Sequence, residues 1–120
     1  MSVPPPAVQV TIPAAPQFVR SVRLIAAGLA SDLGFDVDGL EDVRVAVDEL
    51  CGLFLTPAPN GSIEVRFVPS DGALEVTGHY LGDAEISAPD PLVAEILAAT
   101  TDELDVPSRG SPTFRFLRRP

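Results

Sequence analysis

The chain of 120 residues contains no lysine, no tryptophan and a single cysteine, Cys51. One cysteine excludes an internal disulfide framework and fits a reducing compartment. We expect Cys51 to be a small buried helix residue rather than a reactive thiol. Because no disulfide can support the fold, a hydrophobic core must do so, and an apolar content of 46% is sufficient for one.

Long apolar runs are also missing, and no stretch approaches the length of a membrane span. The beginning of the sequence has neither the basic nor the apolar region of an export signal, so we expect a cytoplasmic protein. No internal repeat or low-complexity tract divides the sequence. We expect a flexible leader over residues 1–7, which include three consecutive prolines, and a single domain over residues 8–118.

Positive charge is scarce, since 8 basic residues stand against 17 acidic ones and the net charge is −9. This balance argues against direct binding to nucleic acid, which needs a surplus of Lys and Arg, and it favours a basic protein partner. Arg115, Arg118 and Arg119 are therefore interpreted as a solvated strand end. With much Ala, Val, Gly, Pro, Asp and Arg, the composition is typical of a GC-rich bacterial genome, such as that of an actinobacterium.

Hydrophobic spacing predicts strands where apolar residues alternate and helices where they recur every three or four positions. In chain order the expected elements are a strand at 8–12, helices at 16–33 and 40–55, strands at 63–67 and 74–76, a helix at 91–104 and a strand at 114–116. This order predicts an α/β (α+β) two-layer sandwich, in which a mixed, mostly antiparallel sheet carries its helices on one face.

Turn and capping residues bound these elements. Asp71-Gly72 suits a tight hairpin turn, and two prolines with an Asn-Gly pair predict a loop over residues 56–61. Asp38, with Glu41 three residues later, matches a capping box and is expected to begin the central helix. No periodicity is recognisable over residues 77–90, so we expect that stretch to be irregular.

The central helix, residues 40–55, carries two stripes at helical spacing. The stripe expected to meet the core is apolar and consists of Leu40, Val43, Val47, Leu50 and Phe54. A second stripe, rotated by about a quarter turn, faces outward beside the core. Its members are Asp42, Ala46, Glu49 and Leu53.

The spelling AVDELC at the centre of this helix resembles the N-box of the histidine-kinase-like ATPases (GHKL, Bergerat fold), and most of all their anti-sigma-factor, RsbW-type serine kinase branch. The resemblance covers roughly residues 8–118. It implies that Glu49 is the catalytic general base or positions the magnesium-bound water. An asparagine four residues after that Glu binds magnesium in the family, but Leu53 stands there and offers no oxygen ligand.

Two further nucleotide elements of the family are altered in this sequence. The family's G1 box, Asp-x-Gly-x-Gly, binds adenine through its Asp, and Gly78 falls where that Asp is expected. The second glycine-rich box, which closes over the phosphates, corresponds to Ser87-Ala-Pro-Asp-Pro91 and contains no glycine. The resemblance thus implies an ancestral nucleotide pocket with degenerate sequence. Its positions are Asp42, Ala46, Glu49, Leu53 and Gly78.

The residues outside these boxes give no catalytic pattern. His79 is the only histidine, so no histidine-based metal centre can form, and no metal ligand set is assigned. Three acids in the following segment, Asp83, Glu85 and Asp90, are interpreted as a solvated loop rather than as ligands. Phe114 and Phe116 are expected in the core.

Three functions remain open at this point. The first is an anti-sigma-like regulator that binds a sigma factor, an anti-anti-sigma (STAS) partner or both, with lost or weakened binding of ATP or ADP and Mg²⁺. Its partner surface is placed on the helix face around Arg20 and Arg23 together with Asp42, Asp48 and Glu49. The alternative is an active serine/threonine kinase that phosphorylates the STAS partner. The third is a scaffold domain that forms a homodimer, as relatives do, or joins another complex.

Overall fold

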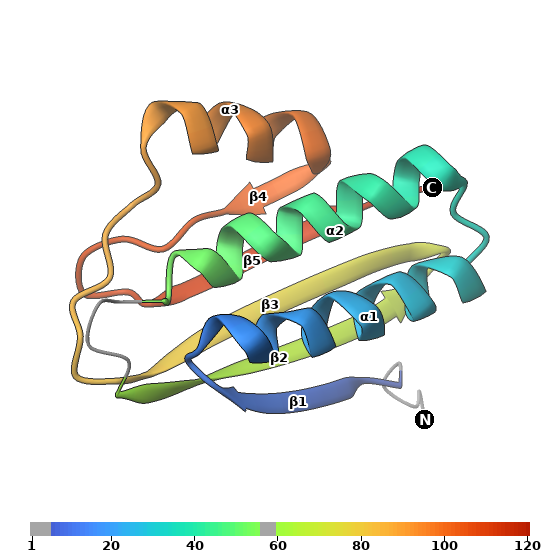
Figure 1. Cartoon of the computed structure of the whole chain (residues 1–120). Coiled ribbons are helices and arrows are strands. Elements are labelled where there is room, and N and C mark those ends of the chain that lie inside the picture. Colours follow the sequence, from blue (N-terminus) through green and yellow to red (C-terminus); the bar gives the residue numbers. More distant parts are fainter. Residues whose placement is uncertain (1–5, 56–59) are drawn as a thin grey trace, which may run out of the picture.

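A five-stranded sheet carries all three helices of the described chain on one face in the computed structural model, which describes residues 6–55 and 60–120 (Figure 1). The strand order is β1-β2-β3-β5-β4. The elements are β1 (Val8–Pro13), α1 (Pro16–Asp32), α2 (Val37–Gly52), β2 (Gly61–Ser70), β3 (Ala73–Gly82), α3 (Pro91–Thr100), β4 (Glu103–Asp105) and β5 (Thr113–Arg118). Residues 1–5 of the expected leader and residues 56–59 of the expected loop lie outside the described ranges.

All four strand pairings are antiparallel, so the expectation of a mixed sheet is wrong, whereas the two layers with helices on one face are confirmed. The hairpin between β2 and β3 also forms as expected. Asp71 and Gly72 both have positive φ, 52° and 78°, as a two-residue turn matched to the strand twist requires. The hairpin and the neighbouring strands β1 and β5 form the part of the sheet on which α1 and α2 pack.

The last predicted helix, residues 91–104, is too long, because α3 ends at Thr100 and a separate strand β4 follows. The hydroxyls of Thr100 and Thr101 donate to the carbonyls of Ile96 and Leu97, which favours the end of the helix. Leu104 then pairs with Phe116 in the sheet. The spacing from Leu97 to Leu104 fits two helical turns equally well, so the sequence pattern did not separate these two structures.

The stretch after Val76 is not irregular, because β3 continues to Gly82. Its buried residues still alternate, with Gly78 and Tyr80 on the core face and Thr77 and His79 on the open face. A glycine and a lone tyrosine at the buried positions hid this alternation in the sequence. The consequence for the candidate site is large, because the end of β3 moves six residues toward the C-terminus.

The central helix begins earlier than expected and is capped by a different residue. Asp36, not Asp38, is the N-cap, and its Oδ1 accepts a hydrogen bond of 2.8 Å from the N–H of Gly39. At the other end the helix stops at Gly52, and Leu53 is the C-cap. The predicted helix at 40–55 is therefore displaced by about one turn.

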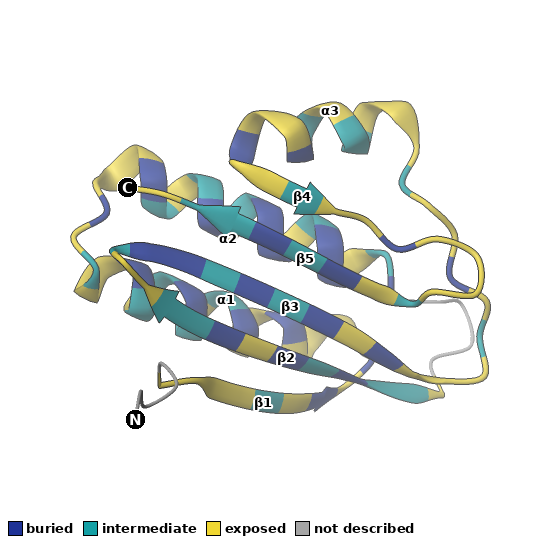
Figure 2. Cartoon of the chain, turned by 180° about the vertical axis from the view of Figure 1, so that it is seen from behind, coloured by how far each residue is buried: buried dark blue, intermediate teal, exposed yellow. Residues whose placement is uncertain are grey.

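The core lies between the helices and the sheet, and the alternation of buried and exposed strand residues is visible from the open face (Figure 2). Four members of the predicted core stripe are fully buried, and Leu40 is half-buried. The fully buried members are Val43, Val47, Leu50 and Phe54. The second stripe of α2 therefore points sideways, toward α3 and β5.

Candidate functional site

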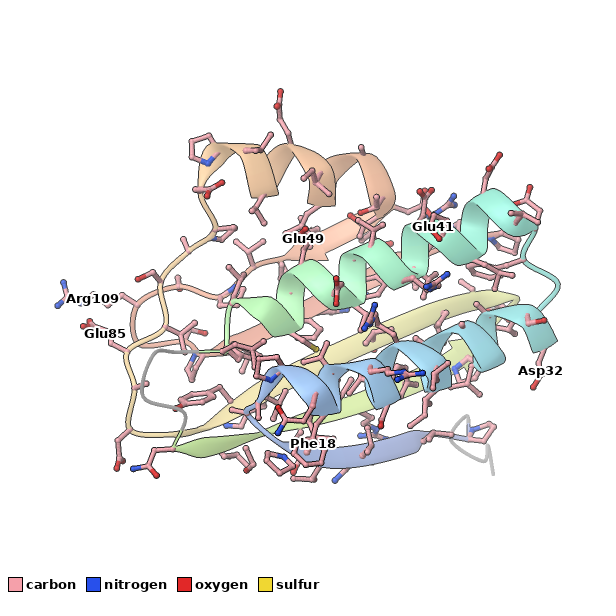
Figure 3. The ribbon with its side chains drawn as sticks, viewed as in Figure 1. Phe18, Asp32, Glu41, Glu49, Glu85 and Arg109 are labelled. Atoms are coloured by element: carbon pink, nitrogen blue, oxygen red, sulfur yellow. The ribbon has the colours of Figure 1, made fainter. Side chains whose placement is uncertain are left out.

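The four positions of the second stripe on α2 do not converge on one cavity. Ala46 is fully buried. Asp42 and Leu53 lie at opposite ends of the helix, roughly 16 Å apart at 1.5 Å per residue. Glu49 is partly exposed on the side of α2 that faces α3 (Figure 3). The predicted N-box residues are thus brought to one helix face, but each has a different environment.

Asp42 is held by an arginine from the last strand. Arg118 Nη2 donates to Asp42 Oδ2 at 2.9 Å, and Arg118 Nη1 lies 3.7 Å from Asp102 Oδ2. Asp102 in turn accepts a hydrogen bond of 2.6 Å from the backbone N–H of Arg119. This network joins α2, β5 and the connection between α3 and β4. Asp42 therefore has a structural role, because it helps to hold these elements together.

The three arginines near the C-terminus are neutralised rather than left as a solvated strand end. Arg115 contacts Glu75 at 2.9 Å and Glu103 at 3.2 Å, and Arg119 contacts Glu103 at 3.3 Å. The hydrogen bond to Glu75 raises the pKa of Arg115. These arginines are engaged with carboxylates, which leaves no basic patch here for nucleic acid.

Three aromatic side chains fill the space between the end of α2 and the sheet. Phe54 follows the helix directly, and its ring centroid lies 5.8 Å from Tyr80 on β3 and 5.7 Å from Phe114 on β5. All three residues are buried. We call Phe54, Tyr80 and Phe114 the aromatic cluster. It lies next to Leu53 and Gly78, two of the positions predicted for the nucleotide pocket.

Gly78 lies inside β3 on the core face, not at the end of the strand where the G1 box was expected. A Cβ at this position would lie 2.2 Å from Cε2 and 2.4 Å from Cζ of Phe114. The Phe114 ring therefore occupies the space in front of Gly78. Packing alone accounts for a glycine here, without any nucleotide.

Tyr80 lies on the core face of β3, two residues after Gly78 and two residues before the strand ends at Gly82. The sequence analysis did not identify Tyr80 as part of β3. The signal was available, because Tyr80 continues the alternation of buried residues two positions after Gly78.

The phenol of Tyr80 is enclosed at the end of the hairpin. Tyr80 is 2% exposed, and its hydroxyl has no hydrogen-bond partner among the described residues. A Cβ on Gly82 would lie 2.4 Å from that hydroxyl, and a Cβ on Gly61 would lie 3.0 Å from it. Both glycines thus permit the backbone of the hairpin to close around the phenol.

The segment between β3 and α3 has no phosphate cradle in its sequence, and its acids are exposed as predicted. Asp90 caps α3, since its Oδ1 accepts a hydrogen bond of 2.9 Å from the N–H of Val93. Glu85 forms an ion pair with Arg109 from the loop before β5 (Figure 3). The segment is therefore tied to a neighbouring loop by side chains.

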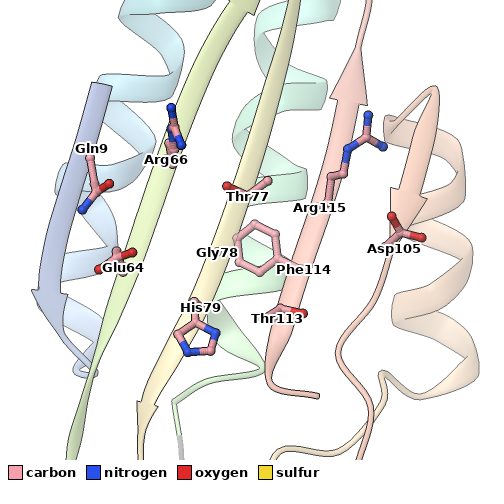
Figure 4. Close-up of a pocket in the computed structure, with 10 residues that line it drawn as sticks. All are labelled: Gln9, Glu64, Arg66, Thr77, Gly78, His79, Asp105, Thr113, Phe114 and Arg115. Atoms are coloured by element: carbon pink, nitrogen blue, oxygen red, sulfur yellow. The ribbon is translucent and has the colours of Figure 1, made fainter. Parts of the chain in front are cut away.

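His79 lies on the open face of the sheet, far from the helices. It borders a groove of about 560 Å³, and Figure 4 shows it projecting from β3 beside Thr113. Charges of both signs line this groove, among them Glu64 and Arg66 on β2. Over residues 6–55 and 60–120, no group of three or more His, Cys, Asp or Glu side chains is arranged to hold a metal ion.

Cys51 is fully buried in α2, as predicted. Burial raises the pKa of its thiol to about 12, and the neighbouring Asp48 carboxylate adds to the effect. The thiol ionises in the unfolded chain near pH 8.5 but stays protonated in the fold. Stability is thus complete below that pH, and we expect the free energy of unfolding to fall by about 1.4 kcal/mol for each pH unit above it.

This expectation is measured by urea unfolding at pH 7, 9 and 10 on the wild type and on Cys51→Ala. The difference in unfolding free energy between the two proteins should shrink as the pH rises, because only the wild type carries the thiol. A difference that stays constant from pH 7 to pH 10 would contradict the assignment.

A second candidate site is a groove between α1 and α2 on the outer surface of the helix layer. It has a volume of about 380 Å³, and we call it the arginine groove. Its lining residues are Arg20, Arg23, Leu24, Ala27 and Arg44. It thus collects three of the chain's 8 basic residues beside the apolar residues Leu24 and Ala27.

The cations of the arginine groove are only weakly engaged. Arg23 Nε lies 3.4 Å from the exposed Asp48, and Arg44 Nη1 lies 3.4 Å from Glu41 in an exposed pair. Arg20 has no ion pair with any residue that the structure describes. Leu24, which also lines the groove, is 65% exposed. Exposed ion pairs of this kind contribute little to stability, so these arginines are available to a partner.

Comparison with known proteins decides the ancestry of this scaffold. Over 81 residues the chain is 37% identical to the serine-protein kinase RsbW of Bacillus velezensis, a match that covers 64% of this chain and 51% of the relative. The RsbW of Bacillus subtilis is 33% identical over a segment with the same shares. The chain is homologous to the RsbW-type kinases. No family model matches it.

The fold of this RsbW homologue is also found in a solved structure. The crystal structure of the RsbU and RsbW domains of Rv1364c from Mycobacterium tuberculosis superposes with a TM-score of 0.62 and 14% identity, over 95% of this chain and 32% of that one. At such low identity the likeness shows the fold alone. It confirms the predicted histidine-kinase-like ATPase (Bergerat) fold.

The chain spans about half the length of the curated relatives it matches. None of its described helices is long and apolar enough to cross a bilayer.

Proposed function

We propose that this RsbW homologue is an anti-sigma-like regulatory protein that binds a sigma factor, a STAS-type anti-anti-sigma protein or both, and that it has lost or weakened ATP binding. The observation that carries the proposal is the pair of residues at the ends of the ancestral pocket. By the family resemblance, Leu53 stands where the magnesium-binding Asn is expected, and Gly78, where the adenine-binding Asp is expected, lies on the core face against the ring of Phe114. Binding to another protein requires neither magnesium nor adenine.

The chemistry of phosphoryl transfer supports this choice. The reaction rests on positioning and on neutralising phosphate charge with magnesium, so the loss of a metal ligand is severe. Glu49, the one residue predicted to be catalytic, is partly exposed on α2 and can be reached by a substrate. A general base alone contributes about 10²–10⁴-fold, which cannot replace nucleotide binding. Glu49 would act as a catalytic base only under the alternative of an active kinase.

The arginine groove is the partner surface that we propose. Its three guanidinium groups and the exposed Leu24 match a partner helix that presents carboxylates around one apolar side chain. The net charge of −9 favours a basic partner for the molecule as a whole, whereas the local charge of this groove favours an acidic helix and repels basic ones. Asp42, predicted for the same surface, is bound by Arg118 and is not included.

Thermal-shift titration with ATP and ADP, with and without Mg²⁺, tests the loss of nucleotide binding. A ligand that binds only the native state stabilises it by RT ln(1 + [L]/Kd), which is about 2.7 kcal/mol for a Kd near 10 µM at 1 mM ligand. An intact pocket would thus raise the Tm by roughly 10 °C. We expect a shift of less than about 1 °C for this chain, with Bacillus subtilis RsbW measured in parallel as the positive control.

Binding to purified sigma factors and STAS proteins encoded by the source genome tests the regulatory role. We expect at least one of them to bind with a Kd that does not change on addition of ATP and Mg²⁺. Failure of every such protein to bind at tens of micromolar would refute the proposal. Transfer of labelled phosphate from ATP to a STAS protein, lost in Glu49→Gln, would instead establish the kinase.

A further inference from the structure

The side of α3 that faces solvent is almost entirely apolar. Glu95 is the only charged residue in the helix, which has the sequence PLVAEILAAT. At 100° per residue, the exposed residues of α3 lie within about a third of the helix circumference, opposite the buried Leu97 and Thr100. Figure 2 shows exposed residues along the length of α3. We call these exposed residues the α3 face, and they are Pro91, Leu92, Glu95, Ala98 and Ala99.

The α3 face differs from the outward face of α2, where the charged residues Arg44 and Asp48 are exposed. A surface helix normally has a polar face opposite its core face, and a helix that is apolar all round is normally covered. Leu92 is 66% exposed at one end of the α3 face. At the other end, the side chains of Ala98 and Ala99 are small enough for a second helix to approach closely. The α3 face therefore has the composition of a helix contact.

The charge on and beside the α3 face is negative. Glu95 lies at the centre of the face, and Glu49 lies on the side of α2 that faces α3 (Figure 3). Asp90 is exposed at the beginning of the helix and caps it. None of these three carboxylates has an ion pair with a residue that the structure describes. A partner with lysine or arginine beside its apolar side chains would complement this arrangement.

The same charge argues against other occupants of the α3 face. If α3 of a second copy packed here across a two-fold axis, the central Glu95 of each copy would approach the other, and like charges would repel. Nucleic acid and anionic lipid surfaces would be repelled for the same reason. A basic helix satisfies both the apolar residues and the carboxylates.

We propose that the α3 face binds a basic amphipathic helix of another protein. The apolar side chains of this helix pack against Leu92 and Ala99, and its lysines or arginines reach Glu95 and Glu49. The inference goes beyond the proposed function, because the arginine groove takes an acidic helix. Since α2 lies between α1 and α3 (Figure 1), the two surfaces are separate and bind their partners independently.

Fluorescence anisotropy with two labelled helical peptides of about 18 residues tests the proposal. Both peptides carry leucines at the i, i+3, i+4 and i+7 positions of one face. The basic peptide has lysines beside these leucines, and the matched acidic peptide has glutamates. We expect the basic peptide to bind the wild-type chain with a Kd on the order of tens of micromolar at about 150 mM salt, as for a small transient interface.

Two pairs of variants separate the α3 face from the rest of the surface. Leu92→Ala should weaken binding of the basic peptide at least about fivefold, whereas Val37→Ala, at an apolar residue 80% exposed on α2, should leave it unchanged. Glu95→Lys should weaken binding at least about tenfold. Asp32→Lys makes the same change of charge at the end of α1, away from α3 (Figure 3), and should stay within about threefold of wild type.

Amide chemical shifts of the labelled chain locate the bound peptide and provide a readout without any substitution. On addition of the basic peptide, the largest changes should fall within residues 91–99. Failure of the basic peptide to bind at 200 µM would overturn the proposal, as would equal losses for Glu95→Lys and Asp32→Lys. A homodimer that dissociates in Leu92→Ala would also overturn it, because a second copy would then cover the α3 face. These measurements use no sigma factor or STAS protein, so they can fail or succeed independently of the proposed function.

Discussion

Replacing Gly78 with alanine will lower the free energy of unfolding by about 2–3 kcal/mol, and the Tm by roughly 10 °C. The new Cβ would stand 2.2 Å from Cε2 of Phe114, and real Cβ atoms do not approach other atoms so closely. Phe114 has little room to move, because its other neighbours include the ring of Phe54 at 5.7 Å. Thermal and urea unfolding measure the loss.

Gly28→Ala is the matched control for this substitution. Gly28 lies inside α1, and a Cβ there would meet nothing within 4 Å. The same Gly-to-Ala change should therefore stabilise the protein by about 0.5–1 kcal/mol, since alanine is the better helix former. Phe114→Leu should reduce the cost of Gly78→Ala, because it removes atoms from the clash. If Gly78→Ala unfolds like wild type, the aromatic cluster is not packed as described.

Reversing the charge of the arginine groove with the double variant Arg20→Glu/Arg23→Glu will weaken binding of the sigma factor or STAS partner by at least about 100-fold. Each substitution removes a cation from the groove and adds a carboxylate that repels the complementary acids of the partner. Leu24→Asp should have a similar effect, because it places a charge against the partner's apolar side chain. Isothermal titration calorimetry with the purified partner measures the change.

Arg66→Glu is the control for this prediction. Arg66 is exposed on β2, on the open face of the sheet, so its reversal changes the net charge without touching the groove. We expect its binding to stay within about threefold of wild type at 150 mM salt, where charges on opposite faces are screened from each other. Equal losses for Arg66→Glu and for the groove variants would show a general charge effect and would remove the groove from the proposal.

Most of the fold could be predicted because hydrophobic periodicity survives in most elements. The core stripe of α2 and the β2–β3 hairpin with its Asp71-Gly72 turn follow from local patterns. The failures occurred where two structures share one pattern. The interval from Leu97 to Leu104 fits a helix, yet the chain turns back at Thr100 so that Leu104 can pair with Phe116. Only pairing with β5 distinguishes these outcomes.

The candidate site was predicted in part. The N-box resemblance located Glu49 and the substitution at Leu53, since both depend on helical spacing within one segment. The resemblance put the adenine position at Gly78, and the sequence did not show that this glycine lies inside a longer β3, against the ring of Phe114. A partner surface was predicted around Arg20 and Arg23, and that surface stays a prediction; the structure places both residues in one groove with Arg44, which the packing of α1 against α2 brings beside them.

The sequence by itself determined the helices and strands of strong periodicity, the absence of an internal disulfide, the acidic charge and the leucine at residue 53, because each depends on local spacing or on residue type alone. The tertiary structure decided what lies together across long separations. It brought Phe54, Tyr80 and Phe114 together in one cluster, bound Asp42 to Arg118, and left β1 uncovered at the edge of the sheet. These contacts depend on how separate elements pack, which no local pattern encodes.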